Sequence, residues 1–215
     1  MQLFRFLVFS LLPALCFCAW KPQPVDTSKP LVVLDAGHGG YDEGARVHSC
    51  LEKRLTLTTV LMTKKYLTSM GYRVILTRSR DVYLSLPRRV AIANKNSGAV
   101  FVSIHYNSCP SADAKGIEIF YFDNKEKGRS LASKKLGDYV LHCVLDETRA
   151  PSRGVKMGKF HVIRETDMPA ILVEGGFMTN KDERTQLKDR AYLERIASGV
   201  AFGVDNYLKS VHGAS

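Results

Sequence analysis

The residues of this chain that could do chemistry stand where apolar runs end. His38, His105 and Glu174 each come at, or just after, the end of a short uninterrupted apolar segment. In open α/β sheets, ligands bind beyond the carboxyl ends of the strands. If the three segments are parallel neighbouring strands, these three side chains meet in one cleft.

A fourth polar residue belongs with them. Glu52 begins a predicted helix, and the loop after His38 could carry it back over the same edge of the sheet. Two imidazoles and one carboxylate form a three-ligand zinc site with an open fourth position. Zinc lowers the pKa of a water molecule to about 7 and polarises a carbonyl group. Glu174 could then take the proton of that water and pass it to the departing nitrogen of an amide.

Each of these residues also has an ordinary interpretation. A single histidine at a strand end is more often a packed, hydrogen-bonded side chain. Glu52 could be an acid favoured by the dipole at a helix N-terminus. The glycines at 37–40 could form a phosphate loop, but the chain has neither Gly-Lys-Ser/Thr nor G-x-G-x-x-G. The metal-site prediction therefore depends on the residues converging at one edge.

The elements that must position these residues alternate along the chain. Apolar strands alternating with helices predict an α/β layered sheet that is at least partly parallel. Gly71 is expected to stop the first helix, and Pro87 fits the first turn of the second. The predicted strands are 31–34, 72–77, 99–104, 116–122, 160–163 and 170–173, and the predicted helices are 52–70, 86–96, 126–145 and 192–208.

The N-terminus predicts export. Arg5 precedes an apolar stretch at 6–19 that contains Pro13 and is shorter than the ~20 residues that a spanning helix needs. We expect a signal peptide at 1–19, a proline-containing linker at 20–30, and a catalytic domain at 31–210. The protein should then be periplasmic or secreted, without a transmembrane segment. An uncleaved anchor, a buried first helix and a lipid on Cys18 remain alternatives.

Composition limits the fold and the partners only loosely. The 215 residues fit one domain, and the net charge of +10 favours an anionic partner. Cys50, Cys109 and Cys143 allow at most one disulfide and match no zinc-finger spacing. The fold must therefore depend on its core.

Several short motifs occur in an order seen in one family. They are DAGHGG at 35–40, EK at 52–53, TR at 77–78, SIHYN at 103–107, RGV at 153–155, MP at 168–169 and VEGGF at 173–177. On these motifs the chain resembles the zinc-dependent N-acetylmuramoyl-L-alanine amidases of bacterial cell walls, over about residues 31–208. The resemblance implies a three-layer α/β fold, in which a mixed, mostly parallel sheet of about six strands is flanked by helices.

The resemblance also implies roles for particular residues. His38, Glu52 and His105 would bind Zn²⁺, and Glu174 would be the catalytic base. The reaction would cleave the amide between N-acetylmuramic acid and the L-alanine of the stem peptide. Peptidoglycan or its muropeptides would be the substrate, with no nucleic acid involved and a monomer as the active form.

Some relatives of this type carry a long inserted helix that blocks the zinc until an activator protein removes it. The stretch at 122–156 has room for one helix and little more. We therefore expect no self-inhibition of that kind, and leave open whether an activator protein takes part.

Further residues are candidates with open alternatives. Asn107 is a candidate substrate-binding residue by resemblance. Arg78 and Arg89 could hold a carboxylate of the stem peptide through bidentate contacts, or could form structural pairs. Cys109 and the remaining histidines, His48, His142, His161 and His212, are expected to be non-ligands.

Other functions remain to be separated. A zinc peptidase that cuts within the stem peptide would use identical metal chemistry. Two histidines and a carboxylate also suit non-haem iron, although a redox-silent exported setting and a further carboxylate favour zinc. A non-catalytic binding protein would have no need of a base. A serine carboxypeptidase is disfavoured because no Ser-x-x-Lys occurs.

Overall fold

The computed structural model describes residues 30–96, 100–123 and 127–212. The predicted signal peptide at 1–19 and all but the last residue of the predicted linker lie outside these residues. The first strand begins at Leu31 and the last helix ends at His212. No helix within the described residues is long and apolar enough to cross a membrane.

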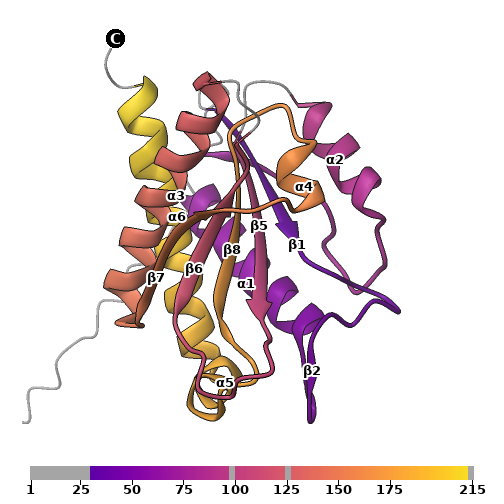
Figure 1. The fold of residues 1–215 in the computed structure, drawn as a ribbon. Helices are drawn as coiled ribbons and strands as arrows, with labels where there is room; N and C mark the ends of the chain where they lie inside the picture. The colour runs from indigo at the N-terminus through magenta and orange to yellow at the C-terminus, as the bar shows by residue number, and fades with distance from the viewer. Residues whose placement is uncertain (1–29, 97–99, 124–126, 213–215) are drawn as a thin grey trace, which may run out of the picture.

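A six-stranded sheet forms the middle of the molecule (Figure 1). Its first four strands are mutually parallel, the fifth is antiparallel to the fourth, and the sixth is parallel to the fifth. This confirms the predicted mixed, mostly parallel sheet. In spatial order the strands are β4 (Arg73–Leu76), β1 (Leu31–Ala36), β5 (Val100–Asn107), β8 (Ala170–Phe177), β6 (Ile117–Tyr121) and β7 (Ser152–Met157).

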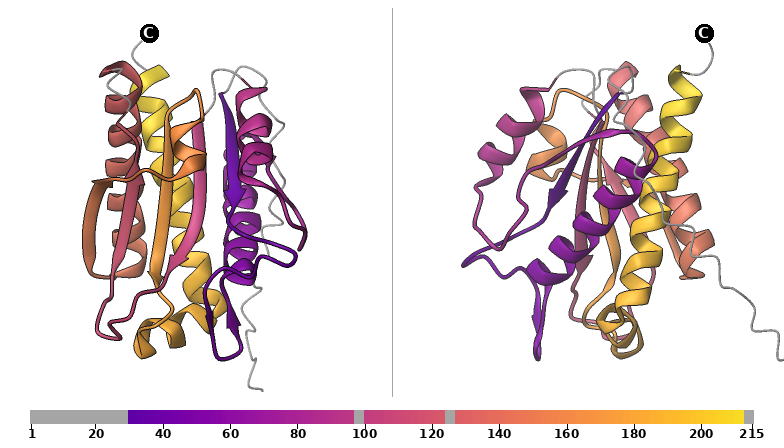
Figure 2. Two further views of the ribbon diagram at one scale, coloured as in Figure 1. Left: turned by 45° about the vertical axis from the view of Figure 1, so that its right-hand side comes forward. Right: turned by 180° about the vertical axis from the view of Figure 1, so that it is seen from behind.

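Helices cover the two faces of the sheet unequally. Three long helices, α1 (Glu52–Ser69), α3 (Lys127–Thr148) and α6 (Arg190–His212), lie over one face, as the right-hand view of Figure 2 shows. Two short helices, α2 (Leu86–Asn94) and α4 (His161–Arg164), lie over the other. Helix α5 (Lys181–Lys188) leads into α6. The helices therefore flank the sheet as predicted.

The central strands are apolar on both faces because both faces are covered. Val32 and Leu34 of β1 belong to the larger core under the long helices. Val33, between them, belongs to a smaller core with Phe101 and Leu172, under the short helices. Alternate side chains of a strand point to opposite faces, so a buried parallel strand has an uninterrupted apolar sequence.

On the face with the short helices, the strands change from apolar to polar along their length. In β8, Ala170 and Leu172 are followed by Glu174 on the same face, and in β5, Phe101 is followed by Ser103 and His105. Figure 1 shows α2 and α4 near the amino ends of these strands. The carboxyl ends on this face therefore remain accessible, and polar residues occupy them.

The helix boundaries follow local signals. Helix α1 ends with Met70 as its C-terminal cap, and Gly71 follows with a φ of +87°, which favours glycine. At the start of α2, the Ser85 side chain accepts a hydrogen bond from the Arg88 amide, and Pro87 occupies the first turn. The sequence analysis predicted the positions of Gly71 and Pro87 at these helix ends correctly.

Some local predictions were wrong or missing. The segment at 160–163, expected to be a strand, contains the start of helix α4, since Arg164 donates its amide hydrogen to the carbonyl of Phe160. A run this short has no measurable period, so a strand and a helix cannot be told apart. The elements not predicted are the hairpin of β2 (Arg46–Val47) and β3 (Cys50–Leu51), strand β7 and helix α5.

Candidate metal centre and active-site cleft

Three predicted ligands meet at the carboxyl edge of the sheet. His38 follows β1, His105 lies in β5, and Glu52 is the first residue of α1. Glu52 Oε1 lies 3.1 Å from His38 Nε2 and 2.9 Å from His105 Nδ1. Within the described parts of the chain, this is the group of His, Cys, Asp and Glu side chains that could hold a metal ion.

The spacing of these donors suits a tetrahedral ion. Donor atoms bonded at 2.0–2.1 Å to a tetrahedral zinc lie about 3.3 Å from one another. One donor atom from each of the three residues falls within 4.8 Å of the others, and the two measured pairs are close to the tetrahedral value. Two imidazole nitrogens and one carboxylate oxygen are also a ligand set that zinc commonly takes. The residues present therefore fit zinc.

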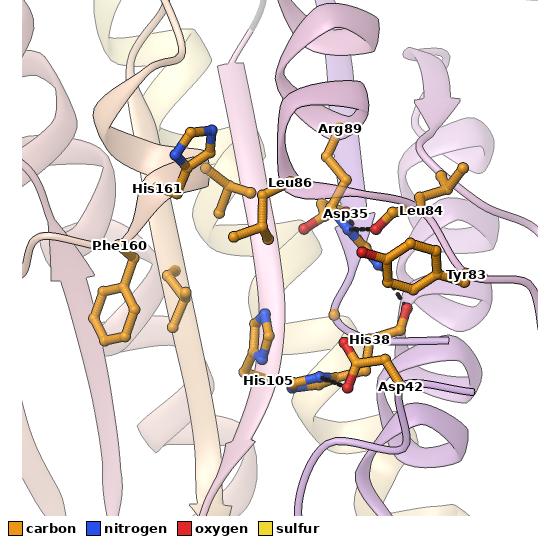
Figure 3. A pocket seen from close by; sticks show the side chains of 13 residues that line it. Asp35, His38, Asp42, Tyr83, Leu84, Leu86, Arg89, His105, Phe160 and His161 are labelled. Carbon is orange, nitrogen blue, oxygen red and sulfur yellow. Dashed lines mark hydrogen bonds and ion pairs between the residues drawn. The ribbon is translucent and has the colours of Figure 1, made fainter. Parts of the chain in front are cut away.

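Hydrogen bonds to the side chain and to the backbone of His38 hold it in place. Its Nδ1 lies 2.9 Å from Asp42 Oδ1, which fixes the ring and leaves Nε2 as the electron-pair donor (Figure 3). Arg89 Nη2 donates to the His38 carbonyl at 2.6 Å. Burial opposes protonation of His38, but the hydrogen bonds and charges of Glu52 and Asp42 together outweigh it and raise the pKa of the imidazole.

Glu52 is fixed by the fold of the preceding loop. Its Oε2 accepts the Ala45 amide at 2.8 Å, and its own amide donates to the Ala45 carbonyl at 2.9 Å. The amino end of α1 adds a favourable dipole. Burial alone would raise the pKa of Glu52, but hydrogen bonds from His105 and His38 hold it well below its usual range. The carboxylate is therefore ionised when the site forms.

Two glycines leave room for the ligands. A Cβ at Gly37 would lie 2.2 Å from Cε1 of the His105 ring. A Cβ at Gly44 would lie 2.5 Å from both Glu52 Oε2 and His38 Cδ2, and the φ of +65° at Gly44 also favours glycine. The glycine-rich loop therefore lets the ligands approach one another closely, without any phosphate-binding role being needed.

Glu174 stands next to the ligands on the adjacent strand. It pairs in register with His105 of β5 on one side and with Glu118 of β6 on the other. Its side chain is only 8% exposed, and its Oε2 has no hydrogen-bond partner among the described residues. Burial, followed by the charges of Glu52 and Glu118, raises the pKa of Glu174 well above the usual value. An unpartnered buried carboxyl beside metal ligands is suited to accepting and releasing a proton.

Sequence reasoning missed Glu118. Its Oε1 accepts the Asn107 side-chain amide at 2.7 Å, and its Oε2 accepts Arg153 Nε at 2.9 Å and Lys156 Nζ at 2.6 Å. The signal was an acid within the alternating strand at 116–122. Asn107 thus lies at this edge as a partner of Glu118, while its role in binding substrate stays a prediction.

For Arg78 and Arg89, the structure favours the alternative of structural pairs over substrate binding. Arg78 is 3% exposed and Arg89 is 2% exposed. The Arg89 guanidinium pairs with Asp35 at 2.7 Å, and its remaining donors are used internally. The groups that accept hydrogen bonds from Arg78 are the carbonyl oxygens of Ala36, Gly37, Lys53 and Arg80 and the hydroxyl of Thr56. Both arginines therefore brace the backbone around the metal ligands.

A cleft of about 350 Å³ opens above the two histidines. In Figure 3, His38 and His105 lie at its lower end, with Tyr83 on one side and Phe160 on the other. Its remaining lining residues are Asp35, Gly37, Asp42, Leu84, Leu86, Arg89, His161, Val162 and Leu172. The two histidines are thus reachable from solvent through a largely apolar cleft.

The remaining histidines and cysteines stay outside the metal centre. His161 lines the cleft but is absent from the group of potential ligands, as are the other three histidines predicted to be non-ligands. Cys50, Cys109 and Cys143 are free thiols, and Cys109 donates to the Ser111 carbonyl.

Comparison with known proteins identifies the class. Residues 32–206 match the family described as N-acetylmuramoyl-L-alanine amidase. The germination-specific N-acetylmuramoyl-L-alanine amidase of Bacillus subtilis is 30% identical over 204 residues, which is 88% of this chain and 84% of that protein.

Solved structures agree with this match. The catalytic domain of CwlV, an N-acetylmuramoyl-L-alanine amidase from Bacillus (Paenibacillus) polymyxa var. colistinus, is 38% identical, with a TM-score of 0.78 over 84% of this chain and 98% of that one. The CwlD amidase from Clostridioides difficile, solved in complex with the GerS lipoprotein, is 29% identical with a TM-score of 0.79, over 85% of this chain and 100% of that one. The chain belongs to the N-acetylmuramoyl-L-alanine amidase family, and the predicted peptidoglycan amidase function is confirmed.

Proposed function

We propose that this chain is a zinc-dependent N-acetylmuramoyl-L-alanine amidase in which His38, Glu52 and His105 hold the metal and Glu174 is the general base. The observation that carries the proposal is the position of Glu52 Oε1 between His38 Nε2 and His105 Nδ1, at 3.1 and 2.9 Å. The bond cleaved is the amide between N-acetylmuramic acid and the L-alanine of the stem peptide.

The three ligands come from separate elements, and each is held by its own contacts. Asp42 orients the His38 ring, and the Ala45 amide holds the second oxygen of Glu52. When bound, zinc supplies Lewis-acid chemistry, which polarises a carbonyl group and makes a water molecule more acidic. The protein contributes a rigid set of donors and an accessible cleft beside them.

Glu174 supplies the proton transfers that amide cleavage needs. Its unpartnered Oε2 can take a proton from the attacking water. The raised pKa of this carboxyl allows it to hold the proton and then release it to the departing nitrogen. Without that second transfer the amide nitrogen would be a poor leaving group.

The setting of the reaction follows from the substrate. Peptidoglycan lies outside the cytoplasmic membrane, and we propose that the chain acts there, periplasmic or secreted, after export by the segment at 1–19. The complex of CwlD with a lipoprotein shows that one relative has a protein partner. Activity measurements with and without added proteins test whether this chain also has one.

Mass spectrometry of muropeptide digests tests the proposal. We expect the zinc-loaded wild type to release free stem peptide and intact sugar, and Glu174→Gln to lose about 10²–10⁴-fold in kcat while keeping its metal and its fold. Glu165→Gln, which changes a half-exposed glutamate that pairs with Arg164 and does not line the cleft, is the matched control.

Three results would contradict the proposal. Cleavage within the peptide, or loss of its last residue, would assign a peptidase. Wild-type activity in Glu174→Gln would remove the proposed base. Elemental analysis of the active protein that finds iron and no zinc would replace the proposed metal.

A further inference from the structure

Two cations stand on the far side of Glu174 from the metal ligands. Arg153 and Lys156, here called the cationic pair, belong to the edge strand β7. Both side chains extend to the same oxygen of Glu118 in the neighbouring strand β6, with Arg153 Nε at 2.9 Å and Lys156 Nζ at 2.6 Å. The mechanism described above uses neither residue.

This cluster keeps one uncompensated positive charge. Two cations share one carboxylate oxygen, and Asn107 donates to the other oxygen. The side chains of the cationic pair are 37% and 41% exposed, whereas Glu118 is buried. A guanidinium has five N–H donors, and among the described residues Arg153 Nη2 has no hydrogen-bond partner. The cluster therefore presents both charge and free donors to solvent.

The rest of the arginine side chain is held in place. The Arg153 guanidinium carbon lies 4.9 Å from the centre of the Phe177 ring, and Nη1 is 3.4 Å from the Lys115 carbonyl. A cation over an aromatic face is attracted by the ring quadrupole. Arg153 is therefore positioned before any ligand binds, which reduces the entropy lost on binding.

The position of the cluster matches the reach of a short peptide. His105, Glu174 and Glu118 form one row across β5, β8 and β6. Neighbouring strands lie about 4.8 Å apart, so the row spans about 10 Å. Extended peptide advances about 3.4 Å per residue, and that distance corresponds to about three residues.

The other side of the metal centre, where Tyr83 and Leu86 line the cleft, has a different character. Tyr83 and Leu86 contribute exposed apolar surface there, and Asp42 contributes an acid. Arg78 and Arg89, the arginines expected to bind carboxylates, are buried, and each of their guanidinium nitrogens donates to a group within the fold. Of the two sides of the metal centre, only the β6–β7 side therefore combines an excess positive charge with an available donor among the described residues.

We propose that the cationic pair binds a carboxylate within the first three residues of the stem peptide, so that the peptide crosses the sheet from His105 toward β7. The proposal rests on the proposed function, because it assumes that the scissile amide sits at the metal ligands. It assigns the pair a role in substrate specificity, and Glu118 positions the pair.

Paired substrates provide the test. Two muropeptides are compared that differ only in whether the carboxylates of the first three stem residues are free or converted to carboxamides. We expect the zinc-loaded wild type to cleave the free acid with a kcat/KM about tenfold higher, mostly through KM, since a hydrogen bond to a charged group is typically worth a factor of this size. Arg153→Gln should reduce this preference to about twofold or less.

Two further variants and a control separate substrate binding from structural support. Arg153→Lys keeps the charge and should retain part of the preference, and Lys156→Gln should lose part of it. Lys134→Gln removes a half-exposed lysine that pairs with Asp138 on α3 and should leave the preference unchanged. Thermal unfolding of each variant verifies the fold, so a general loss of activity is not mistaken for a loss of discrimination.

The outcomes distinguish this inference from the proposed function. If the wild type cleaves both substrates equally well, or if Arg153→Gln keeps the full preference, the inference is wrong while the proposed function stands. If neither substrate yields free stem peptide, the proposed function fails, and this inference fails with it. Should Arg153→Gln not fold, the same comparison is decided by Arg153→Lys and Lys156→Gln.

Discussion

At the scale of single residues, the site depends on carboxyl groups in contrasting surroundings. Glu52 accepts hydrogen bonds and stays ionised, whereas Glu174, one strand away from His105, is buried with an unpartnered oxygen. Glu118 carries its charge next to Glu174 but is compensated by two cations. One residue type thus suits the proposed ligand, the proposed base and the anchor of two cations, according to its neighbours.

Replacing Glu118 should change the pH dependence of the reaction. The negative charge of Glu118 helps to raise the pKa of Glu174, and the base must be ionised to accept a proton. In Glu118→Gln this repulsion is absent and the pKa of Glu174 falls, so the acidic limb of the kcat/KM profile should move to lower pH. The profile is measured from pH 4 to 9 beside Glu165→Gln, which should match the wild type. An acidic limb that stays in place, or that moves to higher pH, would show that Glu118 does not influence the base.

At the scale of elements, a buried network holds the loop that carries His38. Asp35, in β1, accepts hydrogen bonds from Thr77 after β4, Ser103 of β5 and Arg89 of α2. Arg89 also donates to the carbonyls of Ala36 and His38. Helix α2 therefore does more than cover the sheet, since it fixes the backbone on which the first ligand is carried.

Removing the charge of Arg89 should destabilise the protein at neutral pH. Arg89→Leu leaves the Asp35 carboxylate buried and unpaired, which typically costs about 3–5 kcal/mol of unfolding free energy. Arg88→Leu, at the neighbouring exposed position on α2, should cost little. Urea unfolding of both variants beside the wild type measures the difference.

The loss of stability caused by Arg89→Leu should depend on pH, and the direction of this dependence follows from the pKa of Asp35. In the wild type, burial raises the pKa of Asp35, but the charge of Arg89 and hydrogen bonds lower it below 3.8 on balance. The stabilisation is therefore present above the unfolded-state pKa and is lost as pH falls through the folded-state pKa. In Arg89→Leu, burial raises the pKa of Asp35 without an opposing charge. Protonation of Asp35 should therefore restore part of the variant's lost unfolding free energy as pH falls. The difference in unfolding free energy between wild type and variant should become smaller in acid. A difference that stays constant with pH would contradict this account.

At the scale of the whole molecule, unequal covering of the sheet creates the site. Three long helices cover one face and bury the larger core, while α2 and α4, with 9 and 4 residues, cover only part of the other. Helix α3 occupies the stretch where an inhibitory insert was considered, and it packs against α6 on the covered face. Within the described residues, no segment from this stretch lies over the ligands.

The purified enzyme should therefore act without an activator. We expect the zinc-loaded protein, lacking residues 1–30, to release stem peptide from muropeptides on its own, and an added protein to raise its rate no more than about twofold. Progress curves measure the rate of stem-peptide release with and without an extract of cells that make the enzyme. Boiled extract is the control. A protein that holds zinc but turns over only with fresh extract would show that this chain needs a partner.

Local patterns in the amino-acid sequence account for the class of fold and for the residues of the candidate site. Glycines beside His38 and apolar runs ending at His105 and Glu174 are local patterns, and they were enough to predict strands, ligands and base. Tertiary structure decided which side chains meet. Strand order placed Glu118 beside Glu174, a buried Asp35 pairs with Arg89, and backbone carbonyls hold Arg78 inside the fold. These outcomes depend on pairing between residues far apart in the chain, and a local period carries no information about such pairing.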